Sequence, residues 1–66
     1  MTVEEVRAEV ERVRGLAGDD EMAHGAEDDL HQNVLQAIAA GKCADPAKCA
    51  AAALETLQIE FSRWYV

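Results

Sequence analysis

The sequence has few basic residues: six Lys and Arg stand against thirteen Asp and Glu, which gives a formal net charge of −7. Binding to nucleic acid or to an anionic membrane depends on Lys and Arg that neutralise phosphates. The stretch from Gly15 to Gly41 has no Lys or Arg and contains six acids. The composition therefore argues against direct nucleic-acid binding and against binding to an anionic membrane.

Long apolar runs and a basic leader are also missing. No stretch approaches the roughly 18 apolar residues that a membrane span needs, and residues 1–5 are acidic, unlike the start of a signal peptide. We therefore expect a cytoplasmic protein in which Cys43 and Cys49 are reduced. Their C-x5-C spacing fits a zinc site poorly. Free thiols are the first expectation, and a disulfide across a turn is the alternative.

Large apolar residues are scarce as well. The 66 residues make one domain, near the lower size limit for a chain that folds alone, and thirteen of its apolar residues are alanine. Because so few large side chains can be buried, we expect self-association to add to the stability of the fold. The sequence contains no nucleophile–base set and no glycine-rich phosphate loop, so we do not expect an enzyme.

The apolar spacing predicts an all-α fold, either a three-helix up-down-up bundle or a helical hairpin plus a third helix, with oligomerisation as an option. Three helices are expected, over residues 3–14, 20–40 and 46–63. Their expected N-terminal caps are Thr2, Asp19 and Asp45, and Gly41 is the expected stop of the second helix. The third helix has an apolar seam at Ala47, Ala50, Leu54, Leu57, Phe61 and Trp64.

The second helix carries two neighbouring stripes at helical spacing. One is apolar and is the expected core face: Met22, Ala23, Ala26, Leu30, Val34 and Ala37. The other is polar in its first half and apolar in its second: His24, Asp28, His31, Leu35 and Ile38. A helix with two organised faces contacts two sets of neighbours, so the second stripe is the predicted self-contact. Trp64 and Tyr65 are predicted as secondary anchors, because such residues dominate interface hot spots.

The two histidines flank a run of acidic residues, and this pattern allows a metal site as an alternative to the predicted self-contact. Glu21 to His24 reads E-x-x-H, a motif of carboxylate di-iron bundles, and Asp28 to His31 is its aspartate analogue. The candidate metal ligands are His24, Glu27, Asp28 and His31, with Zn or Fe as the metal. Solvated side chains on a helix surface, or a pH-sensitive interface, explain the same residues without a metal.

Three segments also resemble a known group of proteins. They are Asp20-Glu21-Met22-Ala23-His24, Glu27-Asp28-Asp29-Leu30 and Phe61-Ser62-Arg63-Trp64. They look like segments of small helical proteins from actinobacteria and their phages, over about residues 2–66. The resemblance implies a small accessory protein, with phage origin as one setting, and implies no activity or functional residue.

These observations favour a small, acidic, non-enzymatic protein–protein interaction module that forms a homo-oligomer. One alternative is a metal-binding helical protein that uses the histidine stretch. The other is an acidic decoy that occupies the nucleic-acid site of a basic host protein, with Asp19, Asp20, Glu27 and Asp28 as the contacting charges.

Overall fold

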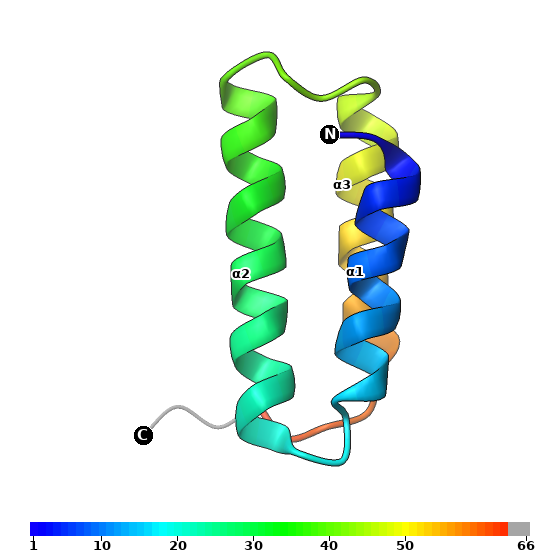
Figure 1. Ribbon diagram of the computed structural model, residues 1–66, viewed down its shortest axis with the longest axis vertical. Coiled ribbons are helices and arrows are strands. Elements are labelled where there is room, and N and C mark those ends of the chain that lie inside the picture. The colour runs from blue at the N-terminus through cyan, green and yellow to red at the C-terminus, as the bar shows by residue number, and fades with distance from the viewer. Residues whose placement is uncertain (64–66) are drawn as a thin grey trace.

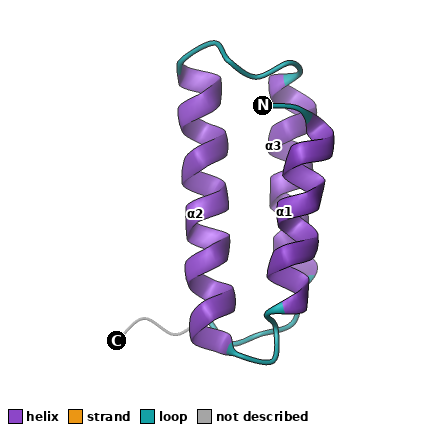
Figure 2. Ribbon diagram, in the orientation of Figure 1, coloured by secondary structure: helices purple, strands orange, loops and turns teal. Residues whose placement is uncertain are grey.

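Three α-helices and one short 3₁₀ helix make up the regular structure of residues 1–63, the part of the chain that the computed structural model describes. α1 spans Val3–Gly15, α2 spans Asp20–Ala39, α3 spans Pro46–Leu54, and the 3₁₀ helix η1 spans Glu55–Gln58. Each α-helix runs antiparallel to the one before it (Figure 1), and each packs against both others. Within these residues the only regular elements are helices (Figure 2). The predicted all-α three-helix up-down-up bundle is confirmed.

Side-chain caps begin all three α-helices. Thr2, Asp19 and Asp45 each accept a hydrogen bond from the backbone N–H three residues further on, at 3.1–3.2 Å. These bonds satisfy N–H groups that a helix start leaves without a partner inside the helix. The three predicted caps are therefore confirmed. None of the helices within residues 1–63 has the length and hydropathy that crossing a membrane requires.

The end of α2 is a Schellman motif that closes on a glycine. Gly41 has a φ of +69°, the left-handed conformation that glycine adopts without steric cost. Its N–H donates to the Ile38 carbonyl at 3.1 Å, and the Lys42 N–H donates to the Ala37 carbonyl at 2.8 Å. This pair of bonds ends the helix. Gly41 thus stops α2 as predicted and turns the chain toward α3.

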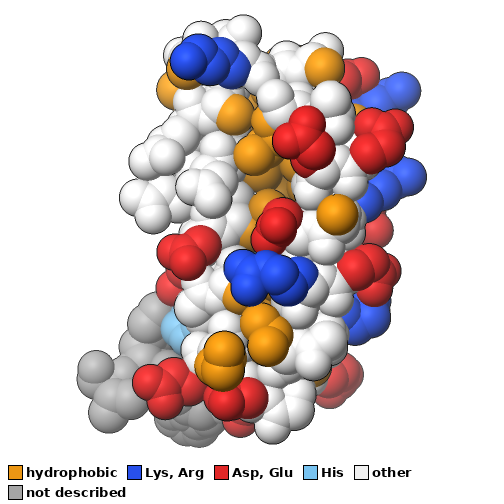
Figure 3. Space-filling view, viewed as in Figure 1, with side chains coloured by type: hydrophobic (Ala, Val, Ile, Leu, Met, Phe, Trp, Pro, Cys, Tyr) orange, Lys and Arg blue, Asp and Glu red, His pale blue; other side chains and the backbone are white. Residues whose placement is uncertain are grey.

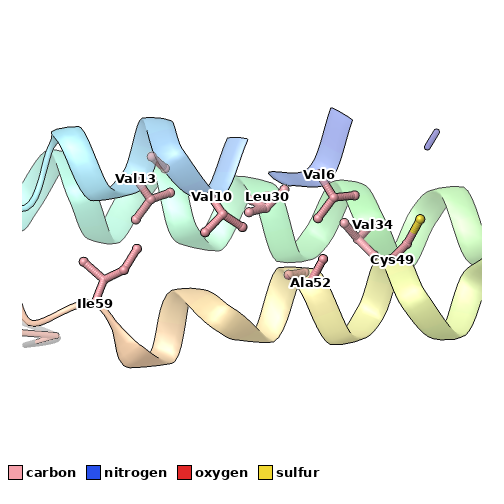
Figure 4. Close-up of a cluster of buried hydrophobic side chains, with 10 residues drawn as sticks. Val6, Val10, Val13, Leu30, Val34, Cys49, Ala52 and Ile59 are labelled. Atoms are coloured by element: carbon pink, nitrogen blue, oxygen red, sulfur yellow. The ribbon is translucent and has the colours of Figure 1, made fainter. Parts of the chain in front are cut away.

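The core is built mainly from small side chains. Its buried members come from all three helices and from the segment after η1 (Figure 4): Val6, Val10, Val13, Ala26, Leu30, Val34, Cys49, Ala52, Ala53 and Ile59. Only two of them, Leu30 and Ile59, are larger than valine. The alanines of α2 and α3 contribute little volume, but they let the helix backbones approach closely. The hydrophobic stabilisation of this fold is therefore limited by side-chain size.

The third predicted helix, 46–63, is wrong in its second half. α3 ends at Leu54 and tightens into η1, and Ile59 is already extended, with φ −83° and ψ 128°. Arg63 explains the change, because its guanidinium donates to the carbonyls of Thr56, Ile59 and Phe61 at 2.8–3.3 Å. The Arg63 side chain thus donates to carbonyl oxygens that would accept backbone N–H bonds if the helix continued.

Part of the predicted core is also wrong, because the buried face of α3 is formed by Cys49, Ala52 and Ala53 and not by the predicted seam. Leu54 and Leu57 are 56% and 54% exposed, and Ile59, outside the predicted seam, is buried instead. Ala47 is also exposed, and Phe61 is partly buried against the core. On α2 the predicted core residue Met22 is 57% exposed.

Candidate interaction surface

The four predicted metal ligands, His24, Glu27, Asp28 and His31, fall into two pairs, His24 with Asp28 and Glu27 with His31. His24 is half-buried, with its Nε2 3.4 Å from the exposed Asp28 carboxylate. Glu27 is only 3% exposed and pairs with Arg63. Among residues 1–63, no three or more His, Cys, Asp or Glu side chains form a group that could hold a metal ion. Within one chain, therefore, residues 1–63 do not gather the predicted Zn or Fe ligands into one group.

Glu27 and Arg63 form a bidentate ion pair between α2 and the segment after η1. Arg63 Nε donates to Glu27 Oε1 at 2.9 Å, and Arg63 Nη2 donates to Glu27 Oε2 at 3.0 Å. The guanidinium also lies 3.9 Å from the centre of the Phe61 ring, a cation–π contact. Arg63 thus fixes the extended segment to α2 through its charge and through the carbonyls described above.

His31 and Thr56 continue this polar cluster along α2. His31 Nε2 lies 3.1 Å from the Ala53 carbonyl and 3.0 Å from the Thr56 hydroxyl. A carbonyl only accepts, so Nε2 carries the proton in the bond to Ala53. The fully buried Thr56 hydroxyl lies 3.1 Å from the same carbonyl and also contacts the Glu27 carboxylate. We call Glu27, His31, Thr56 and Arg63 the polar network.

The surroundings of Glu27 favour its ionised form. Burial raises the pKa of this carboxyl, but hydrogen bonds from Arg63 and Thr56, with the charges of Arg63 and His31, lower it by more. The pKa of Glu27 therefore lies below its ordinary value of 4.5. The carboxylate remains charged at neutral pH and contributes to the stability of the fold.

Other acids that were predicted to contact a basic partner are also used internally. Asp19 caps α2, and Asp20 Oδ1 accepts a hydrogen bond from the Ser62 backbone N–H at 3.1 Å. Glu27 is buried in its ion pair, so it is not on the surface that a partner would meet. Of the four residues predicted for the decoy surface, Asp28 is exposed without such a backbone contact among residues 1–63.

A small apolar pocket lies between α2 and α3. Its volume is about 170 Å³, and its lining is His31, Val34, Leu35, Ala50, Ala53 and Leu54. Leu35 and Leu54 are among the most exposed large apolar side chains, at 66% and 56%. No Asp, Glu, Lys or Arg lines this α2–α3 pocket. It is therefore a mainly apolar site, without an acid, Lys or Arg in its lining, on a strongly acidic protein.

A larger and more polar pocket lies between α1 and α2. It has a volume of about 710 Å³, and its lining includes Glu5, Glu9, Arg12, Asp29 and Asn33. Arg12 donates to Glu9 at 3.0 Å within this lining. On this face, charged side chains of both signs surround the apolar side chains visible between the helices (Figure 3). The α1–α2 pocket therefore has a charged rim, unlike the α2–α3 pocket.

The predicted self-contact stripe does not form a continuous surface. Ile38 packs against the protein's own core, and the ring of His31 bonds to the Ala53 carbonyl. His24 is half-buried, while Leu35 and Asp28 are exposed. The structure thus brings Leu35 beside Leu54 of α3 instead of joining it to Ile38. The predicted anchors Trp64 and Tyr65 lie outside the described residues.

Sequence reasoning missed Arg63 and Thr56 as structural residues. One signal was available, because Arg63 is the only Lys or Arg after Lys48. A single cation that follows an apolar segment is a candidate partner for a buried acid. Nothing comparable marks Thr56, since its role depends on the packing of η1 against α2.

Comparison with protein-family models, with curated proteins and with solved structures finds no match to this chain.

Proposed function

We propose that this protein is a non-enzymatic protein–protein interaction module that self-associates through the α2–α3 pocket. The observation that carries the proposal is the pairing of Leu35 and Leu54, both more than half exposed, at one apolar pocket whose lining has no acid, Lys or Arg. Exposed apolar surface of this kind is typical of sites that a partner covers.

A second copy of the chain is the occupant that best fits this surface. The pocket combines projecting leucines with a lining that contains Ala50 and Ala53, whose small side chains leave room. A twofold axis would place Leu35 of each copy against the alanines of the other, an isologous contact. The pocket lining itself brings no carboxylate into the contact.

The size of the molecule is compatible with such a contact. A typical stable interface buries about 800 Å² on each partner, which is about one-fifth of the 4466 Å² surface of this chain. α2 has 20 residues, about 30 Å of helix, along which the contact can extend. Dimerisation would also add apolar burial to a core of small side chains.

Sedimentation equilibrium of three variants tests the proposal. The unmodified protein is expected to be a dimer at tens of micromolar, and Leu35→Gln is expected to be a monomer of unchanged helicity. Met22→Gln is the matched control, because Met22 is a similarly exposed apolar residue of α2 outside the pocket. A monomeric unmodified protein, or equal dissociation of both variants, would contradict the proposal.

A further inference from the structure

The loop between α2 and α3 is tied to the start of the chain. The Met1 amino group donates to the Lys42 carbonyl at 2.6 Å, and the Ala44 N–H donates to the Met1 carbonyl at 2.9 Å. These two bonds flank Cys43, which is partly buried and packs against the core. The backbone on both sides of this cysteine is thereby fixed, and its thiol is held at the loop end of the bundle.

Cys49 lies opposite, in the first turn of α3. Its N–H donates to the Asp45 carbonyl at 2.9 Å, and its side chain, fully buried, points from α3 into the bundle (Figure 4). Both cysteines are free thiols, and the Cys43 side chain packs against the core cluster to which Cys49 belongs. The neighbouring Cys43 thiol and burial raise the pKa of the Cys49 thiol, while the charge of the Met1 amino group opposes the rise.

We propose that Cys43 and Cys49 are a redox site that forms a reversible intramolecular disulfide. A disulfide needs two cysteines whose Cβ atoms lie about 3.5–4.5 Å apart, and two cysteines that flank one turn and pack in one core cluster are placed to reach that geometry. The pair differs in access, because Cys43 is partly exposed and Cys49 is not. Cys43 is therefore the residue that meets an external oxidant, and Cys49 is the resolving residue.

The oxidant by class is a small disulfide such as oxidised glutathione. The Cys43 thiolate attacks one sulfur of this disulfide, which forms a mixed disulfide and releases one glutathione thiolate. The Cys49 thiolate then attacks the Cys43 sulfur and releases the second glutathione. In sum, the two cysteines lose two hydrogen atoms and one oxidised glutathione becomes two reduced molecules.

Intact-mass analysis after incubation with oxidised glutathione under native conditions tests this assignment. The unmodified protein is expected to lose two hydrogen atoms and to retain no glutathione adduct. Cys49→Ala should accumulate one adduct on Cys43, because the resolving thiol is missing. Cys43→Ala should remain unmodified, because Cys49 is buried.

The result for the unmodified protein tests the proposal by itself, even if a variant fails to fold. A stable glutathione adduct, or two thiols that stay reduced after long incubation, would overturn the proposal. A thermal melt gives a second readout, since the oxidised protein is expected to melt several degrees above the reduced one. The double variant Cys43→Ala/Cys49→Ala should show no such shift.

Discussion

The two ends of the bundle are held together by different chemistry. At one end, the ion pair of Glu27 and Arg63 and the hydroxyl of Thr56 fix the segment after η1 to α2. At the other end, one hydrogen bond from the charged Met1 amino group and one to the Met1 carbonyl connect Met1 to the backbone of the α2–α3 loop, and Gly41 sets the turn (Figure 1). The first end relies on a few strong, mutually dependent contacts, whereas the second relies on local geometry. Substitutions in the polar network should therefore lower the free energy of unfolding more than substitutions at the other end.

The largest effect is expected for Arg63→Ala. The change leaves the buried Glu27 carboxylate without its cation, which should cost about 3 kcal/mol of unfolding free energy, the lower end for a broken buried pair because Arg63 is partly exposed. Urea denaturation measures this cost. The control is Arg14→Ala, which removes an exposed ion pair with Glu11 and should cost less than about 1 kcal/mol. Equal costs would show that the Glu27 pair does not dominate this end.

Acid should weaken the same end of the molecule. The pKa of Glu27 is lowered in the folded protein, so its contribution is complete above the unfolded pKa near 4.5 and is lost as the pH falls through the lower folded value. The unfolding free energy is therefore expected to fall with pH below about 4.5. In Glu27→Gln this fall should be shallower, as measured by urea denaturation at a series of pH values. An unchanged slope would contradict the role of Glu27.

Thr56→Val should have an intermediate effect. Valine has nearly the same shape as threonine, but it removes the hydroxyl that contacts His31, the Ala53 carbonyl and Glu27. Polar groups left short of a partner in a buried site cost about 1–2 kcal/mol. Thr56→Ser, which keeps the hydroxyl, should retain the lowered pKa of Glu27 when the carboxyl is titrated by NMR, and Thr56→Val should raise it. If the two variants titrate alike, the hydroxyl has no part in the network.

The smallest effects are expected for two glycines of opposite behaviour. Gly41→Ala places a Cβ in a left-handed conformation and should cost about 1 kcal/mol, although no atom lies within 4 Å of the new methyl group. Gly25→Ala also meets open space, but it lies inside α2 and should stabilise the protein by about 0.5–1 kcal/mol. Thermal melts measure both effects. If the melting temperatures of the two variants shift in the same direction, backbone conformation does not determine the sign of the stability change.

The sequence predicted the elements that depend on local rules. Caps at Thr2, Asp19 and Asp45 and the stop at Gly41 depend on residues within one turn, and all four are present. The extent of the third helix was wrong because Arg63 captures the carbonyls of Thr56 and Ile59, a competition that periodicity does not register. The exposure of Leu54 has another cause, since the buried face of α3 is that of Cys49, Ala52 and Ala53.

The candidate surface was only partly predictable. Leu35 was expected at a contact, and it lies at the rim of the α2–α3 pocket. Its neighbour Leu54 was assigned to the core instead, because the apolar spacing placed the seam of the third helix on a face that the structure leaves exposed. The roles of Glu27 and His31 as network members depend on residues of the last third of the chain. A pattern read on α2 alone could not show them.

The ion pair joins positions 27 and 63, which are 36 residues apart. A ribosome adds residues in order, so α1 and α2 exist well before the guanidinium that balances Glu27 is made. Until then, packing this part of α2 into the nascent structure would bury an unbalanced carboxylate. Complete folding of the bundle therefore depends on Arg63, which is among the last residues to be synthesised. A chain that ends before Arg63 cannot bury Glu27 as an ion pair.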